Sequence, residues 1–203
     1  MKKSLILFPF QWSPFSPHLA PVSIAANIRK AGYVCDVKDL NLEFYRTVLK
    51  KDFLENIIVK QIKSLPLLAE ELKHIYSVSK KPEDYSIEEQ IKIKKMLFLN
   101  NIQNNKLGST RQVIDNVENA ISLLNDNELF YDIQLVANAI SIVDKALEIV
   151  SLEDFPQQFS LYGFNNLSVK LNYKSILKYC LSNNIFRHFY ENKLKNINNN
   201  YDL

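Results

Sequence analysis

The sequence predicts an α/β fold that is mostly helical. We expect a short parallel β–α–β start (an incomplete Rossmann-like unit), a large all-helical insert and C-terminal helices. The apolar run Leu5–Phe8 is typical of a strand buried on both faces. A second strand pattern, Tyr33–Val37, follows after one helical stretch. Beyond Asn41, apolar residues recur at helical spacing for about a hundred residues.

The first 45 residues follow the order strand, loop, helix, strand. A loop punctuated by prolines leads into apolar residues at helical spacing between Val22 and Ala31. Gly32 stands where the end of a helix favours a residue with positive φ. Two strands joined through one helix must run parallel, with a right-handed crossover, if they share a sheet.

The helical insert divides at polar and proline-containing breaks. Ser86 and Glu89 match a capping box at the start of one helix. A loop is expected within Asn100–Ser109, and Asn125–Asn127 is expected to be a turn. The other expected helices are Leu42–Leu65 (ended by Pro66), Leu67–Val78, Thr110–Leu124 and Leu129–Val150.

The last fifty residues change in character. Gln158–Asn166 predicts an extended segment with a bend at Gly163, and helices are expected at Tyr173–Leu181 and Ile185–Ile197. We therefore divide the chain into a β–α–β start (residues 1–45), a helical region (46–153) and an extended segment with C-terminal helices that return to the sheet (154–203).

Composition excludes several classes of function. The net charge of +3 is small and spread along 203 residues, so we expect no nucleic-acid partner. No apolar run approaches 18 residues and no signal peptide is evident, so we expect no membrane association and a cytoplasmic location. The three glycines form no phosphate-binding loop. The two cysteines, Cys35 and Cys180, belong to no motif, and whether they pair stays open.

The residues also predict neither a catalytic group nor a metal site. His18, His74 and His188 are scattered, and neither ring-nitrogen nor thiolate ligands occur at the spacing that zinc or iron requires. His74 is expected to be an ordinary surface or boundary residue, and His188 is expected to be structural. Adjacent carboxylates such as Glu88 and Glu89 diverge around a helix and are expected to be solvated. The chain alone does not look like an enzyme.

Both ends of the chain carry a family pattern. The matching residues are Leu5–Pro9, Pro14, Pro17, Pro21, Ala31–Val37, Asp39–Asn41 and Phe44–Tyr45, then Phe155–Pro156, Phe159–Leu161, Phe164, Ser175–Leu177, Asn184–Phe186, Phe189–Tyr190 and Tyr201–Leu203. In this respect the chain resembles the N-terminal region of cobalamin-binding-domain radical S-adenosylmethionine enzymes, ending before the rest of the Rossmann-like sheet and the radical domain.

The resemblance implies cobalamin as a ligand of an incomplete site. Doubly wound sheets bind ligands beyond the carboxyl ends of their strands. The implied contacts come from the loops after the two strands, at Pro9, Gln11, Trp12, Ser13, Pro17, Asp39 and Asn41. Trp12 could lie against the corrin or cover the sheet edge, and Asn41 could bind a ligand or cap the following helix.

The chain also departs from the family. It lacks the CxxxCxxC motif, so no iron–sulfur cluster is expected in it and it is not expected to be catalytically competent alone. Because a two-stranded sheet has two open edges, we expect self-association, a helix laid over an edge, or completion by the missing C-terminal portion of the enzyme. Two alternatives remain: a stand-alone helical binding module for a protein or peptide, with an apolar groove among its helices, and a non-catalytic corrinoid carrier.

Overall fold

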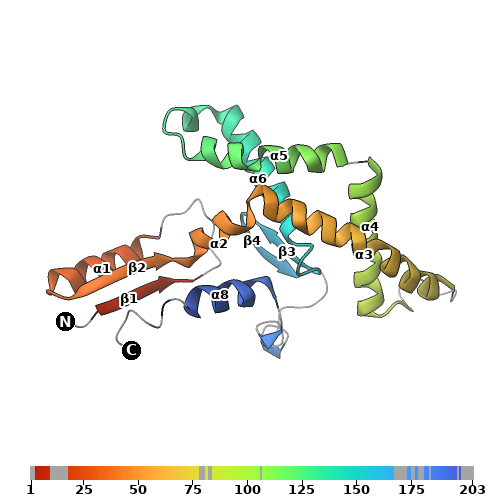
Figure 1. Cartoon of the computed structure of the whole chain (residues 1–203), viewed down its shortest axis with the longest axis horizontal. Coiled ribbons are helices and arrows are strands. Elements are labelled where there is room, and N and C mark those ends of the chain that lie inside the picture. The colour runs from red at the N-terminus through yellow and green to blue at the C-terminus, as the bar shows by residue number, and fades with distance from the viewer. Residues whose placement is uncertain are drawn as a thin grey trace.

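The structure is a computed structural model of the chain. It describes residues 3–9, 18–77, 81, 84–105 and 107–166, and beyond these residues 173, 174, 177, 181, 182, 184–195 and 197. Within them the predicted fold class is confirmed: helices predominate, and a short parallel sheet stands at the start (Figure 1). None of the described helices combines the length and the apolar character needed to cross a lipid bilayer.

The predicted parallel β–α–β start is confirmed. Strand β1 (Lys3–Phe8) and strand β2 (Val34–Asp39) flank helix α1 (Leu19–Lys30). The two strands pair in parallel, from Lys3 opposite Val34 to Phe8 opposite Asp39. Gly32 ends the helix with a φ of 86°, the conformation that glycine adopts most readily. In Figure 1 this unit projects from the helical part of the molecule.

The expectation that the first strand is buried on both faces is wrong. Leu7 is 37% exposed, and the other residues of β1 are exposed or only half-buried. Helix α1 covers one side of the sheet, where Ala25 and Cys35 are buried, and the Arg29 Nε donates a hydrogen bond to the Cys35 carbonyl at 2.8 Å. The main core cluster begins only at Leu40, so its packing does not shield this strand.

The helical part contains α2 (Leu40–Val48), α3 (Lys51–Ser77), α4 (Ile87–Asn105), α5 (Leu107–Leu124), the short 3-10 helix η2 (Leu129–Tyr131) and α6 (Ile133–Val150). The predicted capping box starts α4, since the Ser86 N–H donates to Glu89 Oε2 at 2.7 Å and the Glu89 N–H to Ser86 Oγ at 3.2 Å. The turn predicted at Asn125–Asn127 is also confirmed.

Several predicted helix boundaries in this region are wrong. The expected helix Leu42–Leu65 is divided into α2 and α3 by a break at Leu49 and Lys50. Helix α3 runs through Pro66, because Leu65 and Leu72 on either side of the exposed proline are both buried in the packed interior. Helix α4 continues through most of the expected loop to Asn105, and α5 begins at Leu107. The expected helix from Leu129 is interrupted at Asp132, whose carboxylate caps α6 instead by accepting hydrogen bonds from Gln134 N and Leu135 N.

The C-terminal part returns to the helical core. Strands β3 (Gln157–Ser160) and β4 (Gly163–Asn166) form an antiparallel hairpin with the bend where it was predicted. Helix α8 (Ile185–Lys195) packs through Phe186 and Phe189 on Phe44 of α2, with ring centroids 5.1 and 5.4 Å apart. Most of the helix expected at Tyr173–Leu181, and Cys180 with it, lies outside the described residues.

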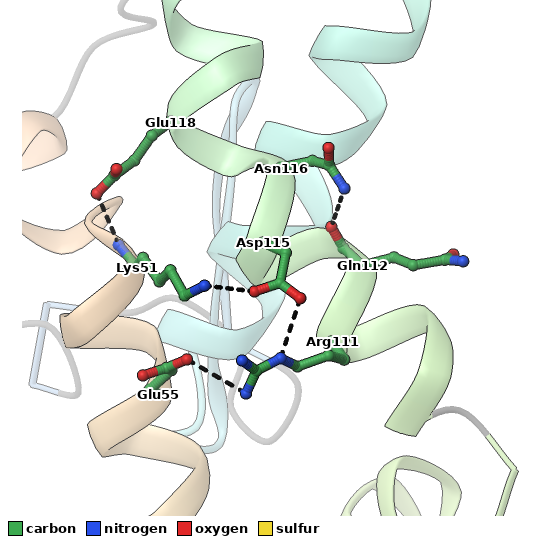
Figure 2. Close-up of polar contacts among 7 residues, drawn as sticks. All are labelled: Lys51, Glu55, Arg111, Gln112, Asp115, Asn116 and Glu118. Atoms are coloured by element: carbon green, nitrogen blue, oxygen red, sulfur yellow. Dashed lines mark hydrogen bonds and ion pairs between the residues drawn. The ribbon is translucent and has the colours of Figure 1, made fainter.

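A polar network fixes α3 against α5 on the surface of the helical part (Figure 2). The Lys51 Nζ lies 2.5 Å from Asp115 Oδ1, and the Arg111 Nε lies 3.0 Å from Asp115 Oδ2. The Arg111 guanidinium also reaches Glu55 at 3.3 Å. At the start of α3, Glu118 accepts a hydrogen bond from the Lys51 backbone N–H at 3.2 Å. One helix therefore supplies the cap of another.

Candidate functional site

The candidate site is the carboxyl end of the β1–β2 sheet. Phe8 and Asp39 form the last pair of the parallel register, and Pro9 follows Phe8 as an exposed residue. Because the strands are parallel, the segments that leave them start side by side, which is the geometry that open α/β sheets use to bind ligands. Of the sequence-predicted site residues, the structure brings Pro9 and Asp39 together at this edge.

Asp39 has two roles in the local structure. It is the last residue of β2 and the N-cap of α2, where its Oδ1 accepts a hydrogen bond from Leu42 N at 2.8 Å. The side chain is exposed. A carboxylate at the N-terminus of a helix also interacts favourably with the helix dipole. The cap therefore holds this acidic group at the strand end, where a ligand amide or hydroxyl could donate to it.

Asn41 does not cap the following helix. The structure places the cap at Asp39, and Asn41 is the second residue of α2, only 3% exposed. The reason is that α2 begins directly at the end of β2, two residues earlier than the sequence pattern indicated. Its side chain is turned into the protein and not toward solvent beyond the strand ends.

His18 belongs to the site but was not among the predicted contacts. Its ring stacks on Phe8 with centroids 4.3 Å apart and an interplanar angle of 27°. It occupies the N-cap position of α1 without making a side-chain cap. Its position at the end of the proline-rich loop could have indicated a place in the site. A single histidine outside any motif, however, gives little evidence of function in a sequence. The predicted contacts Gln11, Trp12, Ser13 and Pro17 lie outside the described residues.

Several charged side chains near the strand ends form ion pairs. Glu43 of α2 lies 4.0 Å from the Lys38 Nζ of β2 and 2.7 Å from the Lys193 Nζ of α8. On the strands, the Lys3 Nζ is 3.0 Å from Asp36. Such half-exposed pairs contribute little stability individually, but the Glu43 pairs bring α8 toward the end of β2. Among the described residues, no three His, Cys, Asp or Glu side chains gather closely enough to bind a metal ion.

Several hollows lie in the helical part, away from the strand ends, and two of them have a partly apolar lining. One, of about 360 Å³, lies among α4, α5 and α6 and includes Phe98, Ile102, Thr110 and Ile149 in its lining. The other, of about 600 Å³, lies between α3 and α4, and its lining is mainly apolar: Ala69, Leu72, Ile93, Met96 and Leu97, with Lys73 and Asn100. The second hollow is open to solvent and has the apolar lining expected of a peptide groove.

The histidines of the helices behave as ordinary surface residues. His74 on α3 is exposed, in agreement with the expected surface or boundary position, and His188 on α8 is exposed too. The adjacent carboxylates Glu88 and Glu89 begin α4, where Glu89 completes the capping box. The strand-end edge remains the candidate site.

No protein-family model, no curated protein and no solved structure matches this chain.

Proposed function

We propose that this chain contributes the first β–α–β unit of a corrinoid-binding domain like that of cobalamin-binding radical S-adenosylmethionine enzymes. The observation that carries the proposal is the parallel register that ends with Phe8 opposite Asp39. An antiparallel or separated pair of strands would have excluded a Rossmann-like site. The proposed role is non-catalytic in this chain alone and, in keeping with the sequence, cytoplasmic.

The open surface of the β–α–β unit supports the proposal. In a doubly wound fold, further strands and helices cover a parallel sheet on both faces. Here Leu7 and Val34 are each 37% exposed, on the sheet face that also carries Lys3 and Asp36. The unit thus leaves apolar surface for the remaining strands of such a domain, supplied by a longer chain or by a partner.

The corrinoid is expected to lie across the strand ends. Cobalamin presents carboxamide groups around its ring, and these can donate hydrogen bonds to an exposed carboxylate such as Asp39. Pro9 and the Phe8–His18 stack would provide apolar contact area beside it. These contacts orient a flat ligand and carry out no chemistry.

Titration of the purified chain with hydroxocobalamin, followed through its visible spectrum, tests the proposal. We expect a saturable change that weakens in Asp39→Asn, which keeps a capping side chain but removes the charge. Asp126→Asn is the matched control, because Asp126 is also exposed and accepts hydrogen bonds from backbone N–H groups, at Glu128 and Leu129. A spectrum that does not change saturably in the wild-type chain rejects the proposal.

The groove between α3 and α4 favours a second candidate, a binding module for a helical peptide. Leu97 is 58% exposed at the groove and Leu72 is buried at its base. Selection of displayed peptides on the chain, repeated with Leu97→Asp, tests this function. Peptides that bind the wild type but not Leu97→Asp would support this function. Peptides that bind both proteins equally well would show that the groove is not the binding site.

A further inference from the structure

Two exposed apolar surfaces of opposite charge stand out on this chain. The first, which we call the acidic tip, is Glu128–Ile133 between α5 and α6. Its apolar side chains are unusually open to solvent: Leu129 is 44%, Phe130 50%, Tyr131 83% and Ile133 83% exposed. A contiguous group of large apolar side chains on a protein surface marks an interaction site more often than scattered ones do.

The acidic tip lies in the most negative stretch of the chain. None of the 25 lysines and arginines, and none of the three histidines, lies between Gln112 and Asp144. The same stretch holds the acidic residues Asp115, Glu118, Asp126, Glu128, Asp132 and Asp144. Asp115 is paired with Lys51 and Arg111, so the charge at the tip comes from Asp126, Glu128 and Asp132. The rest of the chain therefore carries more positive charge than the net value of +3 indicates. A surface that fits the tip must be both apolar and cationic.

The outer face of α1 has this chemistry. Leu19, Val22 and Ala26 follow one another at three- and four-residue spacing and are exposed, with Leu19 72% and Val22 58% accessible. The helix contains no acidic residue and ends in Arg29 and Lys30. Its other side faces the sheet through the buried Pro21 and Ala25. A helix that is apolar on both sides is normally covered on both sides.

These two surfaces lie apart within one molecule. Figure 1 shows the turn between α5 and α6 at the upper left and helix α1 below it on the same side, with their ribbons well separated. Pairing of two tips would bring like charges together, and pairing of two α1 faces would leave both acidic tips uncovered. A two-fold dimer avoids this, because each tip then meets the α1 face of the other copy in two identical contacts.

We infer that a second copy of this chain is the occupant: the acidic tip of each protomer docks on the outer face of α1 of its partner. Tyr131 and Ile133 lie against Leu19 and Val22, and Glu128 lies opposite Lys30. This contact does not involve Asp39 or the edge of the sheet, although Leu19 directly follows His18 of the candidate site. Its small apolar patches suit a reversible dimer.

Sedimentation velocity of the full chain over a range of concentrations tests the inference. We expect a monomer–dimer equilibrium whose dissociation constant rises at least about tenfold in Tyr131→Ser, because exposed aromatic anchors dominate small interfaces. Tyr162→Ser is the matched control, since Tyr162 is 80% exposed in the β3–β4 turn, away from both surfaces. A chain that stays monomeric throughout, or a dimer equally weakened by both substitutions or by neither, overturns the inference.

A charge exchange separates this dimer from any other. Glu128→Lys and Lys30→Glu should each weaken dimerisation, and the double variant should recover most of the loss because the pair is restored with its signs reversed. Recovery supports the proposed contact, and a double variant no tighter than either single variant overturns it. Far-UV circular dichroism checks the fold of each variant, and Ile133→Ser replaces Tyr131→Ser if the latter is misfolded.

Discussion

Lys51 and Asp115, 64 positions apart in the sequence, meet side chain to side chain at 2.5 Å and join the start of α3 to the middle of α5. The hydrogen bond from Lys51 and the neighbouring Arg111 hold the pKa of the Asp115 carboxyl below its usual value of 3.8. The same contact raises the pKa of the Lys51 amine. Both groups are therefore charged over the whole neutral range, and the pair shown in Figure 2 is intact there.

The first prediction concerns acid stability. Because the pKa of Asp115 is lower in the folded than in the unfolded chain, its contribution is present above the unfolded value and is lost as the pH falls through the folded one. We expect Asp115→Asn to lower the melting temperature modestly at pH 7 and to lie closer to the wild type at about pH 3, below the unfolded value of 3.8, where the stabilising difference is already smaller. Glu70→Gln, an exposed change on α3, is the control, and an equal loss at both pH values would contradict the prediction.

The second prediction concerns the docking of α8. Both oxygens of Asp154 accept a hydrogen bond from the Ile185 N–H, at 3.0 and 3.2 Å, and Asn184 Oδ1 accepts one from Arg187 N. Asp154→Ala should reduce the free energy of unfolding by about 1 kcal/mol, the usual cost of a lost helix cap. In Asp154→Ala, the backbone amides of α8 should exchange with solvent faster than those of α6. Asp154→Asn keeps an acceptor and should lose less; an equal loss would contradict a capping role.

The third prediction concerns Pro66, which lies inside α3. A proline removes one hydrogen bond of the helix and crowds the preceding turn. Pro66→Ala should therefore raise the free energy of unfolding, by about 1–3 kcal/mol after the greater freedom of the unfolded chain is subtracted. Urea denaturation measures the change. Leu67→Ala, at a residue 67% exposed, is the control and should stay within about 0.5 kcal/mol of the wild type.

The fourth prediction concerns alkaline stability. Burial raises the pKa of Tyr45 from 10.0 to about 12, and the side chain is only 5% exposed. A phenol that is harder to ionise in the folded state stabilises the fold below pH 10, and this stabilisation disappears as the pH rises toward 12. Tyr45→Phe should therefore lose less stability between these pH values than the wild type. In a pH titration followed by absorbance at about 295 nm, the variant should lack the tyrosine that ionises last in the wild type. Steeper alkaline unfolding of the variant would contradict the assignment.

Local signals in the sequence predicted much of the fold. Gly32, the Ser86–Glu89 capping box and the spacing of the apolar residues are short-range features, and each appears in the structure as expected. The errors arose where tertiary contacts outweigh local preference. Packing on both sides carries α3 through Pro66, and the side chain of Asp132 starts a helix inside an apolar pattern that gives no sign of a break.

The candidate site was predictable only in outline. The order of strand, helix and strand indicated which edge of the sheet to inspect, and it placed Pro9 and Asp39 there. It could not show that β2 leads straight into α2, which is why Asn41 is buried in the helix and Asp39 forms the cap. The stacking of His18 on Phe8 depends on how the loop closes, and loop closure leaves no periodic signal in a sequence.

The direct passage from β2 into α2 has a mechanical consequence. Asp39 ends the strand and Leu40 begins the helix, whose Phe44 is wedged among the aromatic rings of α8. With no connecting segment between them, the end of the strand is joined rigidly to the helix. We therefore expect a displacement at Asp39 to reach Phe44, about one helical turn along α2, and the α8 rings packed on it.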